Sequence, residues 1–238
     1  MCAFSPEEYA LFEKTGEWVF KRLRKTRHPE DLLGVVATAQ KGFDKAYASA
    51  PAEARAAVAC RAGCDACCQV PVGVQAHEVL LAAQHVQKHF SPLELEALIA
   101  RAAAHRAAFA GRSIPERVAL RSPCVMLREG ACSIYEARPE ACRSHHSHDA
   151  AACGINLARG NEELDVFVPA VRGRMFAVML AIDQAVEEAG FDDRAYDFGS
   201  ALHEALTDSL CAVRWTRREA AFPDDCLDGA ESDEAFPG

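Results

Sequence analysis

The cysteines of this chain gather in two blocks, and this arrangement constrains the fold more than any other feature of the sequence. The chain contains 11 cysteines in 238 residues. Seven of them form the blocks, the first with Cys60, Cys64, Cys67 and Cys68 and the second with Cys124, Cys132 and Cys142. Sulfurs two or three residues apart can turn toward one metal ion or cluster. Because adjacent Cys67 and Cys68 tend to point apart, we expect the fold to bring both blocks together.

The start of the chain and its charge indicate a compartment and exclude some partners. Glu7 and Glu8 lie where a secretory signal would have its apolar core. The sequence contains no run of about 18 apolar residues, so we predict no membrane span. The net charge of −9 disfavours binding to a nucleic-acid backbone. We therefore expect a cytoplasmic protein that binds a metal ion or cluster, with no nucleic-acid or membrane partner. The sequence identifies no protein partner.

The number of cysteines argues against a disulfide framework. Cytosolic thiols are kept reduced, and an odd number of cysteines leaves one unpaired. Clustered cysteines in that compartment are typical of metal sites, in which the thiolate is the ligand. Gly63 lies inside the first block and supplies the backbone freedom that a tight ligand loop needs.

Apolar residues at helical spacing predict a mostly α fold. The chain is 50% hydrophobic but only 8% aromatic, and its many alanines favour closely packed helices over a sheet. Prolines and capping residues mark several helix starts, among them Ser91 before Pro92. The helices are predicted at residues 7–27, from 29 through 47, briefly from 51, at 76–90, from 92 to 109, at 169–189 and at 200–218.

The predicted organisation is one helical bundle around a loop-rich cysteine cluster. Gly130 lies between two short apolar segments, which predicts a small β-hairpin next to the second block. We expect a single domain over residues 1–222, with the cysteine cluster at 60–153. The end of the chain, 223–238, is acidic and contains proline and glycine, so we expect a flexible tail.

The surroundings of Cys142 also suit a metal ligand. Pro139 is predicted to begin a short helix with Cys142 in its first turn, where free N–H groups and the helix dipole lower the pKa of a thiol. Arg138 and Arg143 flank this turn and can neutralise thiolate charge or donate to the sulfurs from behind the ligands. The alternative for both arginines is an ordinary surface ion pair.

This combination of motifs resembles the YkgJ-type cysteine cluster family, also called the CxxCxxCC domain family, which is described as zinc- or iron-chelating. The likeness is close at residues 60–68 and 123–143 and looser between them. It implies that the seven cysteines of the two blocks are metal ligands. Tyr135, Arg138 and Arg143 fall on the family pattern CsIYxxRPxxCR. The chain departs from the pattern with three residues, rather than two, between its first two cysteines.

Several residues outside the family pattern are further candidates. Cys153 is either an eighth ligand or a buried thiol. His145, His146 and His148 either complete the coordination sphere or are solvated loop residues. Glu78 is an oxygen ligand, a base, or, as we expect, an ordinary exposed glutamate.

The residues leave the metal and the activity open. Zinc and iron–sulfur clusters both accept all-sulfur ligation. Flagellin lysine-N-methylases, described as iron–sulfur proteins, resemble this family, which favours an iron–sulfur cluster. Three functions follow: a metal-binding module without chemistry of its own, an iron–sulfur enzyme related to those methylases, and a metal carrier or sensor. The first is favoured because we find no phosphate loop or serine–histidine–carboxylate order in the sequence.

Overall fold

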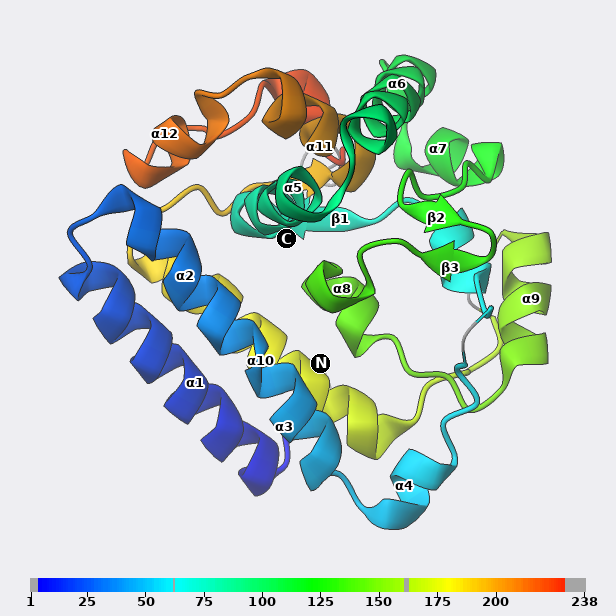
Figure 1. Ribbon diagram of the computed structural model, residues 1–238. Helices are drawn as coiled ribbons and strands as arrows, with labels where there is room; N and C mark the ends of the chain where they lie inside the picture. Colours follow the sequence, from blue (N-terminus) through cyan, green and yellow to red (C-terminus); the bar gives the residue numbers. More distant parts are fainter. Residues whose placement is uncertain (1–3, 62, 161–162, 230–238) are drawn as a thin grey trace, which may run out of the picture.

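The computed structural model describes residues 4–61, 63–160 and 163–229, and it is mostly α-helical, as predicted (Figure 1). The α-helices are α1 (Pro6–Lys25), α2 (Pro29–Gln40), α3 (Gly42–Ser49), α4 (Ala52–Ala56), α5 (Ala76–His89), α6 (Pro92–Phe109), α7 (Ile114–Leu120), α8 (Glu140–Ser144), α9 (Ala150–Arg159), α10 (Pro169–Glu188), α11 (Phe198–Thr207) and α12 (Cys211–Thr216). Short 3₁₀ helices are η1 (Ala66–Gln69), η2 (Tyr135–Ala137) and η3 (Asp224–Cys226). None of the described helices is long and apolar enough to cross a membrane.

Two small antiparallel sheets complete the described fold. Strand β2 (Leu127–Arg128) pairs with β3 (Ala131–Cys132), which confirms the predicted hairpin. Strand β1 (Gly73–Gln75) pairs with β4 (Ala195–Asp197), a contact between distant parts of the chain that the sequence did not predict. The second sheet ties the segment after the first cysteine block to the start of α11.

The long helices α1, α2 and α10 lie side by side and contribute buried residues to the single hydrophobic core (Figure 1). Val19 and Leu23 of α1 are almost completely buried, as are Val178 and Ile182 of α10. Full burial of such a side chain stabilises a fold by about 1.5–3 kcal/mol. Helix α10 also contacts α8, so this layer supports the element that carries Cys142.

A second group of helices, α5, α6, α11 and α12, packs above this layer in Figure 1. Helices α6 and α11 approach closely at Gly199, where a Cβ would overlap the ring of His105. That ring is fixed by a hydrogen bond of 2.9 Å between His105 Nε2 and the Asp197 carboxylate. Glycine is therefore required at position 199 for steric reasons.

Several element boundaries differ from the sequence prediction. The helix predicted from residue 29 is divided after Gln40, and the one predicted at 200–218 is divided at a turn in which Asp208 accepts from the N–H of Leu210. Helices α7 and α9 were not predicted. Ser91 caps α6 through the N–H of Glu94, as predicted.

Part of the segment expected to be a flexible tail is packed against the rest of the protein. Cys226 is fully buried. Arg117 of α7 donates to the carbonyl oxygens of Leu227 and Asp228, at 3.0 Å each. These contacts hold the chain as far as residue 228, because a guanidinium can satisfy two carbonyl groups at once. The rest of the predicted tail, residues 230–238, lies outside the described residues.

Candidate metal centre

The two cysteine blocks meet through a backbone hydrogen bond. The N–H of Cys124, the first cysteine of the second block, donates to the carbonyl of Cys68, the last cysteine of the first block, at 2.7 Å. Such a bond fixes the two chain segments within a few ångströms of each other. The meeting of the blocks that the sequence analysis required is therefore present.

The first block is folded as a series of tight turns. The N–H of Cys64 donates to the carbonyl of Arg61, and that of Cys68 to the carbonyl of Asp65, at 3.0 and 2.8 Å. Gly63 has a φ of +83°, a conformation that glycine adopts without steric strain. The prediction that Gly63 gives this loop its backbone freedom is confirmed.

One set of thiols, the Cys142 group, consists of Cys67, Cys124, Cys132 and Cys142. Burial raises the pKa of the Cys142 thiol well above its usual value, and the nearby Cys124 and Cys67 thiols raise it further. Burial also raises the pKa of Cys124 to about 11, with smaller contributions from Cys132 and Cys67. These interactions link cysteines of both blocks, in agreement with the backbone bond between Cys124 and Cys68.

Cys67 connects this group to the remaining cysteines. A hydrogen bond with the Cys68 thiol raises the pKa of Cys67, and burial of the sulfur adds to the shift, although the residue as a whole is exposed. Cys67 and Cys64 also act on Cys60, whose thiol pKa is raised chiefly by burial.

A second set, the Cys60 group, consists of Cys60, Cys64 and Cys153, and two of its members, Cys60 and Cys153, contact Ser147. The backbone N–H of Ser147 donates to Cys60 Sγ at 3.2 Å, and Cys153 Sγ donates to the Ser147 hydroxyl at 3.1 Å. Ser147 itself is buried. Nothing in the local sequence pattern singles out this serine, because its place depends on how the segment before α9 folds over Cys60.

All eight predicted ligand residues therefore lie in one region, but their sulfurs are not drawn into a single tight centre. Among the described residues, no three cysteine sulfurs lie within 4.8 Å of one another. Four thiolates around one zinc ion, with Zn–S bonds of about 2.3 Å, place their sulfurs about 3.8 Å apart. Four cysteine ligands would therefore have to move closer together to bind a single zinc ion.

Helix α8 positions Cys142 as predicted but does not lower its pKa. The helix begins at Glu140, so Cys142 lies in its first turn. The expected lowering of the thiol pKa is wrong, because the pKa is raised. The helix has only five residues and a correspondingly small dipole, whereas the thiol is buried among other thiols, so the loss of hydration outweighs the dipole.

Glu78 is buried rather than exposed, and it anchors α8. Its exposed fraction is 5%. One carboxylate oxygen accepts from the N–H of Glu140 and the other from the N–H of Gln75, both at 2.6 Å. Burial raises the pKa of Glu78 to about 7, and the charge of Glu140 adds to this. The carboxylate therefore caps α5 and α8 together and fixes the helix that carries Cys142.

The two arginines that flank the turn with Cys142, Arg138 and Arg143, make different contacts. The Arg138 guanidinium lies 3.9 Å from the centre of the Tyr135 ring. Burial raises the pKa of the Cys132 thiol, and the positive charge of Arg138 opposes that shift. Arg143 donates to the carbonyl oxygens of Arg138 and Glu136. In the described part of the chain neither arginine forms an ion pair or donates to a sulfur.

The histidines after Cys142 pack against aromatic rings. His146 stacks on Tyr47 and His145 contacts the edge of Phe167, each with 5.1 Å between ring centres. His148 is exposed. In the residues that the structure describes, no group of three potential metal ligands within 4.8 Å includes any of these histidines.

The fold and the site together define a helical protein with a cysteine-rich centre of metal-binding type. Residues 59–162 match the model of the CxxCxxCC family, whose description reads "putative zinc- or iron-chelating domain". The matched span covers less than half of the chain and includes all eight predicted ligands. Comparisons with curated proteins and with solved structures found no match.

Proposed function

We propose that this protein holds an iron–sulfur cluster or zinc through its two cysteine blocks. The proposed ligands are Cys60, Cys64, Cys67, Cys68, Cys124, Cys132, Cys142 and Cys153. The observation that carries the proposal is the backbone hydrogen bond between Cys124 and Cys68, which holds the two blocks together, and the Cys67 thiol also contributes to the raised pKa of Cys124. Clustered thiolates are soft ligands that suit both zinc and iron–sulfur clusters.

The Cys142 group is the best candidate for the main centre. Its four sulfurs match the number that a zinc ion or a four-cysteine cluster requires. It draws ligands from both blocks, and Cys124 and Cys142 have the buried thiols. The positive charge of Arg138 acts on Cys67 and Cys132 and would offset part of the thiolate charge. Arg143 holds the backbone at Arg138 and so supports that position.

The spacing of the sulfurs favours a cluster over a single zinc ion. In an iron–sulfur cluster several iron and sulfide atoms lie between the cysteine sulfurs, so these sulfurs are further apart than around one tetrahedral ion. The described cysteine sulfurs, with no three within 4.8 Å of one another, agree better with the larger group. The N–H of Ser147 directed at Cys60 Sγ is also the kind of contact that tunes a cluster's reduction potential.

A carrier or sensor function is the second candidate, and the exposure of two cysteines supports it. Cys60 and Cys67 are exposed, whereas the other six proposed ligands are only partly accessible. A centre that exchanges its metal needs ligands that an acceptor thiol can reach. The enzyme alternative relied on Glu78 or a histidine facing the metal, and the two backbone bonds of Glu78 favour a structural role instead.

Anaerobic purification tests the proposal directly. We expect iron with an equal amount of acid-labile sulfide and a visible absorption band, or zinc in a colourless sample. Cys132→Ser is expected to lose most of the metal, and Cys226→Ser, a buried cysteine outside both blocks, to retain it. If the wild-type protein contains neither metal, or if both variants retain the full amount, the ligand assignment is wrong. A carrier would transfer its metal within minutes to a chelating acceptor, and a structural centre would not.

A further inference from the structure

Three side chains that can bind a metal meet in the core, apart from the cysteines. They are His77 of α5, Glu140 of α8 and Asp183 of α10, and we call them the core cluster. One ligand atom of each lies within 4.8 Å of the other two. His77 and Glu140 are almost completely buried, and Asp183 is partly buried. Figure 1 shows why three helices can contribute, because α8 lies between α5 and α10.

No described lysine or arginine is paired directly with the carboxylates of the core cluster, and the charge of Arg143 acts on Glu140 only from a greater distance. Among the described residues, no lysine or arginine nitrogen lies within 4.0 Å of the Glu140 or Asp183 carboxylate. Glu140 Oε1 accepts from Gln40 at 2.9 Å and lies 3.3 Å from His77 Nε2. Glu140 Oε2 and His77 Nδ1 are buried without a hydrogen-bond partner in the described part of the protein. Buried, unpartnered groups of this kind are strongly destabilising unless a cation or a proton satisfies them.

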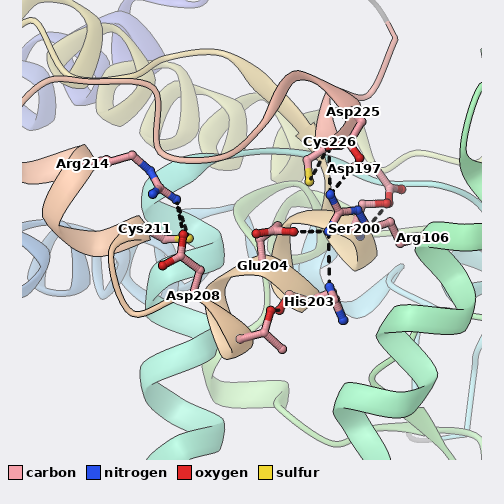
Figure 2. Close-up of polar contacts among 11 residues, drawn as sticks. Arg106, Asp197, Ser200, His203, Glu204, Asp208, Cys211, Arg214, Asp225 and Cys226 are labelled. Atoms are coloured by element: carbon pink, nitrogen blue, oxygen red, sulfur yellow. Dashed lines mark hydrogen bonds and ion pairs between the residues drawn. The ribbon is translucent and has the colours of Figure 1, made fainter.

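A second group of potential ligands lies equally close together, but positively charged side chains already pair with it. Glu204, Asp208 and Cys211 also have ligand atoms within 4.8 Å of one another. As Figure 2 shows, arginines already bind this group: Arg106 pairs with Glu204, and Arg214 donates to both Asp208 and Cys211. Proximity alone therefore does not define a metal site. The lack of any such arginine distinguishes the core cluster.

We propose that His77, Glu140 and Asp183 bind one divalent transition-metal ion, as a centre separate from the thiols. One imidazole with two carboxylates is a donor set that suits Mn²⁺, Fe²⁺ or Zn²⁺, whereas Mg²⁺ and Ca²⁺ prefer oxygen ligands throughout. The charge of the ion would balance the two carboxylates. Glu78 stays outside the ligand set, because its oxygens are held by the N–H groups of Gln75 and Glu140.

Manganese is the probe for this site, because it favours carboxylate and imidazole over thiolate. Metal-free protein is titrated with Mn²⁺, and bound ion is measured by electron paramagnetic resonance. We expect one tightly bound Mn²⁺ per chain and at least tenfold weaker binding in Asp183→Asn. Asp208→Asn, in the arginine-bound group, is the matched control and should bind as the wild type does. Cys132→Ser should also keep its Mn²⁺, which separates this site from the proposed thiol centre.

The wild-type protein alone can overturn the proposal. Pulsed resonance spectra of the bound Mn²⁺ should show coupling to one imidazole nitrogen, from His77. Absence of bound Mn²⁺, or bound Mn²⁺ without nitrogen coupling, would exclude the site even if the variants fail to fold. Equal affinity in Asp183→Asn and wild type would exclude it as well, and the carboxylates would then be satisfied by protons.

Discussion

The thiol groups and the core cluster meet on one short helix, yet they are built in opposite ways. Glu140 and Cys142 lie two residues apart on α8. The other proposed cysteine ligands come from turns, a hairpin, a 3₁₀ helix and the helix α9, whereas His77 and Asp183 are held by the long helices α5 and α10. Donor atoms on packed helices are fixed before any ligand binds, whereas those on loops are free to adjust.

The difference indicates which part of the molecule depends on a metal for its stability. The two cysteine blocks are joined by the backbone bond between Cys124 and Cys68. A metal that is bound by both should hold them together much more firmly, because metal binding then contributes to the free energy of folding. The core cluster needs no such help, since α10 is packed along its length by buried side chains such as Val178.

Removal of the metal from the thiols should have the largest effect. Structural zinc in small peptides contributes on the order of 10 kcal/mol to folding. If about half of this applies here, chelation lowers the melting temperature by roughly 10–20 °C. Hydrogen exchange should then show lost protection at the amides of Cys68 and Cys124, with protection retained at Val178. Equal loss in both places would mean that the cysteine region and the helical layer are one cooperative unit.

A core substitution in the helical layer should give the converse result. Leu23 of α1 is 1% exposed, and Leu23→Ala is expected to lower the free energy of unfolding by about 2–5 kcal/mol, through lost burial and a cavity. The metal content of the folded protein should not change, because α1 carries none of the proposed ligands. Denaturant unfolding with metal analysis of the folded fraction checks both statements. A parallel loss of metal would contradict the separation of the two regions.

The sequence predicted those parts of the fold that depend on local signals. Ser91 and Pro92 mark the start of α6, and Pro6 and Pro169 stand at the first positions of α1 and α10. Helices α7 and α9 also have caps, Ser113 and Asp149, but they are short. The pairing of β1 with β4 could not be predicted, since each strand has three residues and their partners are far apart in the sequence.

The same distinction applies to the candidate sites. The cysteines could be found because ligands of one metal recur at short spacing along the chain. His77, Glu140 and Asp183 stand alone in the sequence, and only the packing of α5, α8 and α10 brings them together. Ser147 was missed for the same reason. Glu78 was placed on the surface because an isolated glutamate usually lies there.

The next largest effect is expected at Glu78, which connects the two kinds of site. Glu78→Ala leaves the N–H groups of Gln75 and Glu140 without their acceptor. The loss should be about 3 kcal/mol, since each buried unsatisfied N–H costs about 1–3 kcal/mol. Glu78→Gln retains one acceptor oxygen and should lose less. Thermal unfolding of the two variants shows which one loses more stability. An equal loss of stability in both would show that the bonds from Gln75 and Glu140 are not what stabilises the protein.

The Asp197 carboxylate, which accepts hydrogen bonds from neighbouring side chains, should make a smaller contribution to stability that depends on pH. Burial tends to raise the pKa of Asp197, but hydrogen bonds from His105 and Ser200 hold it below the usual value. A lowered folded-state pKa stabilises the protein above the unfolded pKa of about 3.9, and this stabilisation is lost as the pH falls through the folded value. We expect a loss of about 1.5 kcal/mol in the acid range. In Asp197→Asn the free energy of unfolding should depend less on pH in the acid range. An unchanged pH dependence would contradict the assignment of this effect to Asp197.

The smallest loss of stability is expected for Asp149→Ala, and this variant tests whether the Cys60 and Cys142 groups are separate from each other. Asp149 caps α9 by accepting from the N–H groups of Ala151 and Ala152, and Asp149→Ala should lower stability by about 1 kcal/mol. Because α9 carries Cys153, the alkylation of this thiol in metal-free protein should become faster, whereas that of Cys142 on α8 should not change. Mass spectrometry of the labelled cysteines distinguishes the two. Faster labelling of both would mean that all eight cysteines form one coupled centre, and the division around Ser147 would have to be abandoned.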